Sequence, residues 1–339
     1  MKLPNFTSIN EEWFYSRFTA LITFAAIAGY FFTLAKQRNE LSAITRNVLI
    51  GFGCCTLFLW LLPDNSHSAS ITMSLIHMPL LLISLLALAF MNRAWRSSPA
   101  RLLFIRYLGE LAIYTVLILI GGMILTAVTF ALFQLIELSI ESWYLEYVVV
   151  FGMVASPVVG TYLYDYVLNR ESKLASILSN VFSPLFFITI SGYLLATLLQ
   201  GKSPFSDRDF LIVFNGLLLV IWGLTVFSIS GMATSMRSHL SDWMNVCLVS
   251  VTLVVNSIAL SAILFRWAEY GLTVNRIVVT GANLLIFIHL ILILVSYVQY
   301  IRHKNTTEQL EQTVATYLPA YSLWSIFVVT LLPLLFSFA

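Results

Sequence analysis

Charged residues are scarce in this chain of 339 amino acids. Lys and Arg number 18 and Asp and Glu 16, together 10% of the sequence, whereas a soluble domain carries about 25%. Hydrophobic residues make up 59%, so the chain has too little polar surface to cover a globule in water. This composition excludes soluble enzymes and disordered regulators. The net charge of +2 is too small to indicate a nucleic acid as a partner, and the lipid bilayer is the predicted solvent.

Cysteine is also rare, and the usual catalytic motifs are missing. Cys54, Cys55 and Cys247 all lie inside apolar runs, where they cannot form a secreted disulfide framework or a four-ligand zinc site. The sequence holds no His-Glu-x-x-His, no Gly-x-Ser-x-Gly and no phosphate-binding glycine-rich loop with a lysine. We therefore predict no metal site and no cofactor, and an enzyme is the less favoured class of function.

Apolar runs long enough to cross a bilayer recur along the whole chain. A membrane-spanning helix needs about 20 apolar residues, and these runs lack the alternation of a barrel strand. The sequence therefore predicts an all-α, polytopic membrane helix bundle. Residues 1–17 are expected to form a short interfacial segment, with a frayed terminus as the alternative, and 18–339 a single membrane domain. The ten predicted spans are 18–35, 47–62, 69–91, 107–136, 144–168, 175–200, 210–232, 243–265, 277–300 and 319–339. The short second span, 47–62, leaves a re-entrant segment as an alternative.

The distribution of basic residues predicts the orientation. Connections after odd-numbered spans hold 12 Lys and Arg residues, and the opposite side holds six. Short loops rich in Lys and Arg stay in the cytoplasm. Both termini are therefore expected on the outer side of the membrane.

A polar turn near the end of the eighth span carries a resemblance to a known family. The sequence reads Glu269-Tyr270-Gly271-Leu272-Thr273-Val-Asn-Arg276. This Tyr-Gly-Leu-Thr-x-x-Arg turn resembles the hallmark of a bacterial multi-pass membrane family, domain of unknown function 4153. The turn at 201–210 and the Asn-containing span after it are also similar to that family, and the resemblance covers roughly residues 140–339. It implies a bacterial inner membrane and a helical membrane fold, and it assigns no catalytic residue.

The same turn has a physical interpretation. Gly271 suits the left-handed position that ends a helix, Leu272 is the apolar residue that follows, and Thr273 is a good N-cap for the next helix. Arg276 is a cation in the first turn of a helix, where the dipole prefers an anion, so we expect it to have a partner. Glu269, a lipid phosphate or an anionic ligand at the outer surface are the candidates. The turn is either a purely structural corner or a docking surface for a protein partner.

Polar residues inside the spans are costly in lipid and are often functional. His289 is the deepest titratable side chain, and Asn283 lies six positions earlier, about 120° round the helix. Such a histidine is either a hydrogen-bonded packing residue or a carrier of protons or cargo, because imidazole can change charge near neutral pH. Near the predicted inner surface, Glu110 lies four residues after Arg106 at a helix start, where the dipole and the arginine both favour a carboxylate, so we expect a structural role. Asp165 belongs to a run of tyrosines that is expected to anchor its helix at the interface or, as an alternative, to gate a substrate.

Two neighbouring spans carry Ser-Pro at similar depth. Ser156 and Pro157 lie in the fifth span, and Ser183 and Pro184 in the sixth. At 1.5 Å per residue the prolines lie about 16 and about 14 Å from the same surface. Each proline removes a helical hydrogen bond and frees a carbonyl, for which the serine is a replacement donor. Broken helices at the midplane are typical of transport sites, although kinked packing helices produce the same pattern.

These observations favour transport or export of a small solute through a midplane site. A second class of function is a non-catalytic membrane sensor or assembly partner that docks through the outer turn. A third is an enzyme that acts on a lipid-linked substrate, with acidic or imidazole groups at the outer surface. The residues available for that chemistry are Asp64, His67, Glu137, Glu141 and Glu146.

The basic-residue distribution predicts that the Arg276 turn and the C-terminus at Ala339 both face the periplasm. Alkaline phosphatase fused after either residue should be active, and green fluorescent protein fused there should be dark, because each reporter matures on one side of the membrane. Fluorescence without phosphatase activity at both positions would show that the orientation is reversed.

Overall fold

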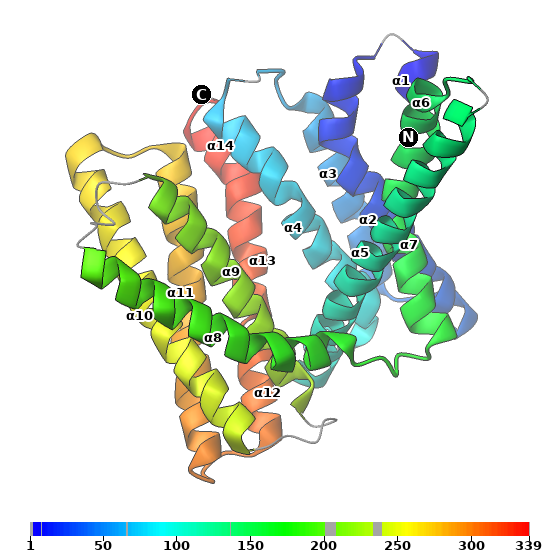
Figure 1. The fold of residues 1–339 in the computed structure, drawn as a ribbon. Coiled ribbons are helices and arrows are strands. Elements are labelled where there is room, and N and C mark those ends of the chain that lie inside the picture. Colours follow the sequence, from blue (N-terminus) through cyan, green and yellow to red (C-terminus); the bar gives the residue numbers. More distant parts are fainter. Residues whose placement is uncertain are drawn as a thin grey trace. The chain divides into compact units, whose positions relative to one another are not determined.

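The computed structural model describes residues 3–7, 9–65, 67–135, 137–200, 208–232 and 239–338. These residues are almost wholly helical and include no strand, which confirms the predicted all-α membrane bundle (Figure 1). The main helices are α1 (Leu3–Phe6), α2 (Glu11–Gln37), α3 (Ala43–Leu61), α4 (Ala69–Met91), α5 (Ser98–Leu135), α6 (Glu141–Trp143), α7 (Val150–Tyr162), α8 (Leu174–Gln200), α9 (Arg208–Ser230), α10 (His239–Tyr270), α11 (Val274–Ile301), α12 (Thr307–Thr316), α13 (Leu318–Ile326) and α14 (Leu332–Leu335). Short 3₁₀ or π-helical turns join some of them: η1 (Asn92–Ala94), η2 (Tyr144–Val149), η3 (Leu163–Val167) and η5 (Phe327–Leu331).

Each of the ten predicted spans overlaps a helical segment, although several helices begin earlier than predicted. Within the described residues, nine helical segments are long and apolar enough to cross a bilayer, and the described part of α9 adds a shorter apolar helix at Phe214–Ser230. The short second span is a helix of 19 residues, so its length suffices for crossing without a re-entrant turn. At the N-terminus, α2 begins at Glu11, because the Asn10 side chain accepts the backbone N–H of Trp13 at 3.0 Å. An interfacial role for 1–17 stays a prediction.

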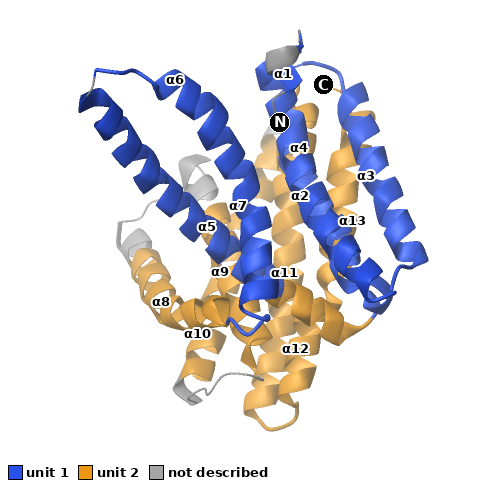
Figure 2. Ribbon diagram, turned by 90° about the vertical axis from the view of Figure 1, so that its right-hand side faces the viewer, with its two compact units in different colours: residues 1–66, 75–96, 107–172 blue, residues 67–74, 97–106, 173–339 orange. Residues whose placement is uncertain are grey.

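The chain forms two compact units that alternate along the sequence (Figure 2). Unit 1 comprises 1–66, 75–96 and 107–172, and in it α2 packs against α3 and α7. Unit 2 comprises 67–74, 97–106 and 173–339. Within unit 2, α8 contacts α9 and α10, and α10 and α11 are neighbours joined by a short corner. The chain passes between the two units several times. This division does not test whether the chain is a single membrane domain, which stays a prediction.

Arginine side chains close the C-terminal ends of three helices. The last carbonyls of a helix have no partner within it, and leaving them unbonded in an apolar environment costs several kcal/mol each. Arg17 donates to the carbonyls of Leu59, Leu62 and Pro63 at the end of α3, at 2.9, 2.5 and 2.9 Å. Its own side chain is buried and lies over the Trp13 ring. This contact explains how a charged residue is accommodated inside α2.

Arg106 does the same for α9 in unit 2. Its Nε donates to the Ser230 carbonyl, and its Nη2 forms an ion pair of 2.9 Å with Glu311. Glu311 belongs to α12, which extends the last predicted span by 12 residues toward its N-terminus. Residues 307–316 are mostly polar, so the search for apolar runs did not find this helix. Its start is marked by a complete capping box formed by Thr306 and Gln309.

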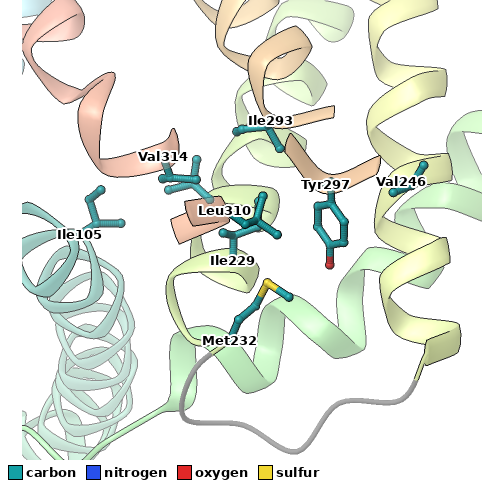
Figure 3. Packing of buried hydrophobic residues seen from close by; sticks show 9 residues of the cluster. Ile105, Ile229, Met232, Val246, Ile293, Tyr297, Leu310 and Val314 are labelled. Atoms are coloured by element: carbon teal, nitrogen blue, oxygen red, sulfur yellow. The ribbon is translucent and has the colours of Figure 1, made fainter. Parts of the chain in front are cut away.

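A cluster of apolar side chains holds α12 in unit 2. Leu310 and Val314 lie against Ile229 of α9 and Ile293 of α11 (Figure 3). The full cluster consists of Ile105, Val226, Ile229, Met232, Val246, Ile293, Tyr297, Leu310 and Val314. Burial of one such side chain stabilises the fold by about 1.5 to 3 kcal/mol. The cluster therefore anchors the polar helix α12 through its single apolar face.

The final helix is interrupted near its end by η5 and Pro333. A π-helical turn is one residue wider than an α-helical turn, and proline has no N–H to bond the carbonyl four residues before it. That carbonyl belongs to Val329, and the buried Ser74 hydroxyl donates to it at 2.8 Å. Both residues belong to unit 2, so a side chain from α4 completes the backbone of the last span.

Gly281 allows close contact between α11 and α13. A Cβ atom at this position would lie 1.9 Å from the ring of Trp324. The ring is rigid, and Phe327 packs against it with the ring centroids 5.3 Å apart. Only glycine therefore fits at position 281 without moving α13.

Replacement of Gly281 by Ala should lower the thermal unfolding midpoint, because the clash with Trp324 costs about 1 to 3 kcal/mol. Gly216→Ala is the matched control: it lies in α9 of the same unit, and an added Cβ there meets nothing within 4 Å. Its midpoint should stay equal or rise, since alanine favours a helix. The double variant with Trp324→Leu should regain part of the loss. Equal midpoints for both glycine variants would contradict the packing argument.

Candidate functional site

The corner at 270–276 has the backbone that the sequence indicates. Gly271 has a φ of +73°, and its N–H bonds the Trp267 carbonyl at 3.0 Å, which is the simple left-handed termination of a helix. Leu272 is exposed. The Thr273 side chain accepts the backbone N–H of Arg276 and caps α11. The structural interpretation of the turn therefore accounts for three of its residues.

Arg276 bonds the end of the preceding helix. Its Nη1 donates to the Gly271 carbonyl at 2.6 Å. The cation thus lies at the C-terminus of α10, where the helix dipole favours it, although in sequence it belongs to the first turn of α11. Glu269 is exposed, and the Tyr270 side chain and residues 201–207 of the second family-like turn lie outside the described residues. A docking role for the corner stays a prediction.

The two Ser-Pro pairs differ in their hydrogen bonds. Ser156 donates at 2.9 Å to the Met153 carbonyl, which is the carbonyl that Pro157 leaves without a helical partner. Ser183 donates instead to the Ser179 carbonyl at 2.7 Å, one position before the carbonyl freed by Pro184. The first pair lies in unit 1 and the second in unit 2, so their proximity stays a prediction.

His289 lies in a cage of aromatic side chains, the histidine cage, formed with Trp222, Tyr317 and Tyr321. His289 is the 16th of the 28 residues of α11 and is 1% exposed. Its Nδ1 receives the indole N–H of Trp222 at 3.1 Å and lies 2.9 Å from the Tyr321 hydroxyl. The Tyr317 ring stacks on the imidazole with centroids 4.4 Å apart. The cage thus joins α9, α11 and the final helix at mid-span.

The indole contact sets the position of the imidazole proton. An indole N–H only donates, so Nδ1 of His289 must be an acceptor and the neutral ring carries its hydrogen on Nε2. Nε2 is buried and has no hydrogen-bond partner. A buried donor of this kind costs about 1 to 3 kcal/mol. The cage therefore leaves one imidazole N–H group without a partner among the described residues.

The final helix breaks beside the histidine cage. α12 ends at Thr316, and α13 begins at Leu318 with Pro319 in its first turn. Tyr317 lies between them and caps both helices. The Pro319 ring lacks the N–H that would bond the Ala315 carbonyl. Sequence reasoning missed this break because the predicted span began at 319. The Tyr-x-Pro sequence after a capped polar helix was the signal that could have revealed it.

Asn283 belongs to a second polar group, the amide layer, formed with Asn215 and Asn256. Its Nδ2 donates to Asn215 Oδ1 at 2.8 Å, and its backbone carbonyl accepts from Asn256 Nδ2 at 3.2 Å. Asn256 is 1% exposed, and its Oδ1 has no partner. Asn283 and His289 contact different side chains, as their offset of about 120° predicts.

A third polar group, the hydroxyl network, lies nearer the other end of α11. It consists of Asn180, Ser228, Asp242, Asn245 and Tyr297. The residues come from four helices, α8 to α11, and the described side chains are connected by bonds of 2.8 to 3.3 Å. Sequence reasoning missed this group because Asp242 lies before the predicted span 243–265 and Asn180 is an ordinary polar residue in its helix.

In unit 1, Asp165 and Glu110 have structural partners. Asp165 receives the Tyr30 hydroxyl at 2.7 Å and pairs with Arg170. Glu110 is 2% exposed and receives the Ser172 hydroxyl. Both carboxylates therefore have partners within unit 1, whereas Arg106, the neighbour expected for Glu110, pairs with Glu311 instead. An anchoring role for Asp165 at the membrane interface stays a prediction.

Most of the acidic groups considered for surface chemistry are exposed. Glu137 and Glu141 are exposed, and Glu146 is half-buried. Asp64 is 79% exposed and lies 3.6 Å from Arg17, and His67 belongs to the other unit. These placements add no argument for the enzymatic alternative.

Loss of the imidazole should destabilise the histidine cage. His289→Leu removes the single Nδ1 lone pair that the Trp222 and Tyr321 donors share, so one partly buried donor loses its bond at about 1 to 3 kcal/mol and the unfolding midpoint should fall. His289→Asn keeps an acceptor near the position of Nδ1 and should lose less. Thermal unfolding of the purified protein, followed by tryptophan fluorescence, measures both. A midpoint for the Leu variant equal to that of the unmodified protein would show that the cage does not stabilise the fold.

No protein-family model, curated protein or solved structure matches this chain. The resemblance carried by Tyr270 to Arg276 therefore stays a prediction. The case for function rests on the three polar groups of unit 2.

Proposed function

We propose that this protein transports or exports a small solute, and that the pathway runs through unit 2. The observation that carries the proposal is the buried, unpartnered Nε2 of His289, at mid-span and beside a broken helix. Discontinuous helices at the midplane are the usual architecture of a transport site. A purely structural histidine would normally have both nitrogens bonded, because unbonded buried donors are rare in native proteins.

Unpartnered polar atoms are concentrated in the same unit. Among the described side chains, ten buried N or O atoms have no hydrogen-bond partner, and eight of them belong to unit 2. The eight residues are Ser176, Ser191, Asn245, Asn256, Trp267, Thr280, His289 and Trp324. Such atoms are costly unless something bonds them. A pathway that admits water or a polar solute would satisfy them, whereas a solid structural bundle would not.

The polar groups lie at successive depths along α11. At 1.5 Å per residue, His289 is about 9 Å from Asn283 and about 12 Å from Tyr297. Ile286 and Leu290 lie between these levels and pack with Leu218 and Val249. The apolar side chains close the path in this conformation, so transport requires these helices to move apart, as alternating access does.

The solute suited to this interior is small and uncharged. The amide layer and the histidine cage present neutral donors and acceptors, and their aromatic and aliphatic neighbours disfavour an unpaired charge. The bacterial inner membrane, periplasmic termini and membership of the uncharacterised family form part of the same proposal, supported by the basic-residue distribution and the Tyr270 to Arg276 turn.

Transport requires water to reach the polar groups, and cysteine labelling tests this in membranes. In a background with Cys54, Cys55 and Cys247 replaced by Ser, cysteines at Asn256 and His289 should react with a water-soluble, cationic methanethiosulfonate. Ile221→Cys is the control, because Ile221 is fully buried in an apolar cluster of the same unit. We expect labelling at least ten times faster at Asn256 and His289.

Equal and negligible labelling at all three positions, in protein that denaturation makes fully reactive, would contradict transport. That outcome would favour the sensor or assembly role, with Arg276 and the outer corner as the surface to test next.

A further inference from the structure

The polar helix α12 covers the end of unit 2 at which α9 and α11 finish (Figure 1). Its buried side chains are Leu310, Glu311, Val314 and Ala315, whose spacing places them on a single face of the helix. This face packs on the apolar cluster that includes Ile293, one turn after the histidine cage in α11 (Figure 3). In this conformation α12 therefore closes unit 2 between the cage and this end.

Polar contacts help to hold α12 in this position. Nη2 of Arg106 pairs with Glu311 at 2.9 Å, and Nε of the same side chain donates to the Ser230 carbonyl at the end of α9. Thr313 donates to Ser296 of α11 at 3.1 Å. The Arg106 side chain is 23% exposed, so water has access to the ion pair. Elements with few buried apolar side chains and water-accessible polar contacts are those that open locally and serve as lids.

The junction between α12 and α13 has the construction of a hinge. Pro319 has no N–H for the Ala315 carbonyl, so one bond of the helical ladder is missing where α12 meets α13. At its other end α12 is fixed as a helix by the capping box of Thr306 and Gln309. It can therefore move as a rigid element, with the change of dihedral angles confined to Tyr317, as in other hinges at the ends of helices.

The hinge residue also belongs to the histidine cage. The Tyr317 ring stacks on the imidazole of His289 with centroids 4.4 Å apart. Tyr321, whose hydroxyl lies 2.9 Å from Nδ1, comes from α13 on the other side of the break. Rotation of α12 about Tyr317 would therefore uncover one face of the imidazole and keep the Tyr321 contact. The same movement would withdraw Leu310 and Val314 from the apolar cluster.

We propose that α12 is a hinged lid on the histidine cage, held shut by the ion pair of Arg106 and Glu311. When the ion pair separates, α12 swings about Tyr317 and the cage opens toward the end of unit 2 at which α9 and α11 finish. The movement of the lid stands on the contacts of α12 alone. Its role as the gate through which a solute reaches the cage rests on the proposed function.

Cysteine labelling of the buried face of α12 tests the lid in the purified full-length protein. In the same cysteine-free background, Val314→Cys keeps a small apolar side chain and reacts with the cationic methanethiosulfonate when the lid is open. Glu311→Gln removes the charge of the carboxylate from every contact that it makes, and should raise the labelling rate at least tenfold. Glu308→Gln is the matched control, because it removes an equal charge from the exposed face of α12, and the rate should not change. Ile221→Cys should stay unreactive in both variants.

The hinge is tested by a pair of proline variants. Pro319→Ala restores the missing N–H and stiffens the junction, so it should lower the labelling rate of Val314→Cys at least threefold in the Glu311→Gln background. Pro333→Ala is the control: it lies in the same final span beyond the junction, and the carbonyl that Pro333 frees is already bonded by Ser74. The rate should not change in that variant.

The gating role predicts that a cysteine at His289 also reacts faster in the Glu311→Gln background. Equal labelling of Val314→Cys in the Glu311→Gln and Glu308→Gln variants would overturn the lid. An equal rise at Ile221→Cys would overturn it as well, because the whole unit would then loosen rather than α12 alone.

The same experiment separates the lid from the proposed function. A faster reaction at Val314→Cys without one at His289→Cys would refute gating of the cage. Negligible labelling of both Asn256→Cys and His289→Cys with the lid open would contradict transport, and the rates at Val314→Cys would still decide whether α12 moves.

Discussion

The bonding of backbone carbonyls at helix ends is the constraint on which this structure depends. In a soluble protein, water can bond these carbonyls. A chain with 10% charged residues is suited to a bilayer, where water is absent from the hydrocarbon core and the protein must supply the donors. Among the described residues, three basic side chains donate to carbonyls at helix C-termini: Arg17, Arg106 and Arg276. The planar guanidinium can bond several carbonyls at once, which lysine cannot do in the same geometry. The same need explains two serine hydroxyls that donate to carbonyls left free by prolines: Ser74 bonds the Val329 carbonyl, and Ser156 bonds the Met153 carbonyl.

Much of the fold was predictable because the spans are set by hydrophobic length. Apolar runs determine where a helix lies in lipid, and Gly271 and Thr273 mark a helix end and start by local chemistry alone. Several helices begin earlier than predicted, and the largest difference, 12 residues, is at α12. Its polar residues pointed to a loop. The pairing of Glu311 with Arg106, about 200 residues away in sequence, and the burial of Leu310 and Val314 show why this polar segment forms a helix that packs by one face.

The candidate site was only partly predictable. The depth of His289 in an apolar run made it conspicuous, and Asn283 was found for the same reason. The partners of His289 could not be predicted, because no local sequence pattern shows that Trp222 or Tyr321 lies next to a residue tens of positions away. Arg276 shows the same limit. The dipole argument required a partner, and one partner is the backbone carbonyl of Gly271, which no side-chain pattern in the sequence indicates. Asp242 and Asn245 were missed because each is unremarkable until four helices bring their oxygens together.

The wide turn at η5 has a consequence for the length of the final span. One extra residue per turn offsets the helix faces on its two sides by about 100°. Trp324, before the turn, reaches Gly281, and Leu332, after it, packs with Val274 and Val278 of the same helix α11. The offset lets both segments face α11. The segment 327–331 should therefore accept changes of side chain more readily than the gain or loss of a single residue, which would rotate one contact away from its partner.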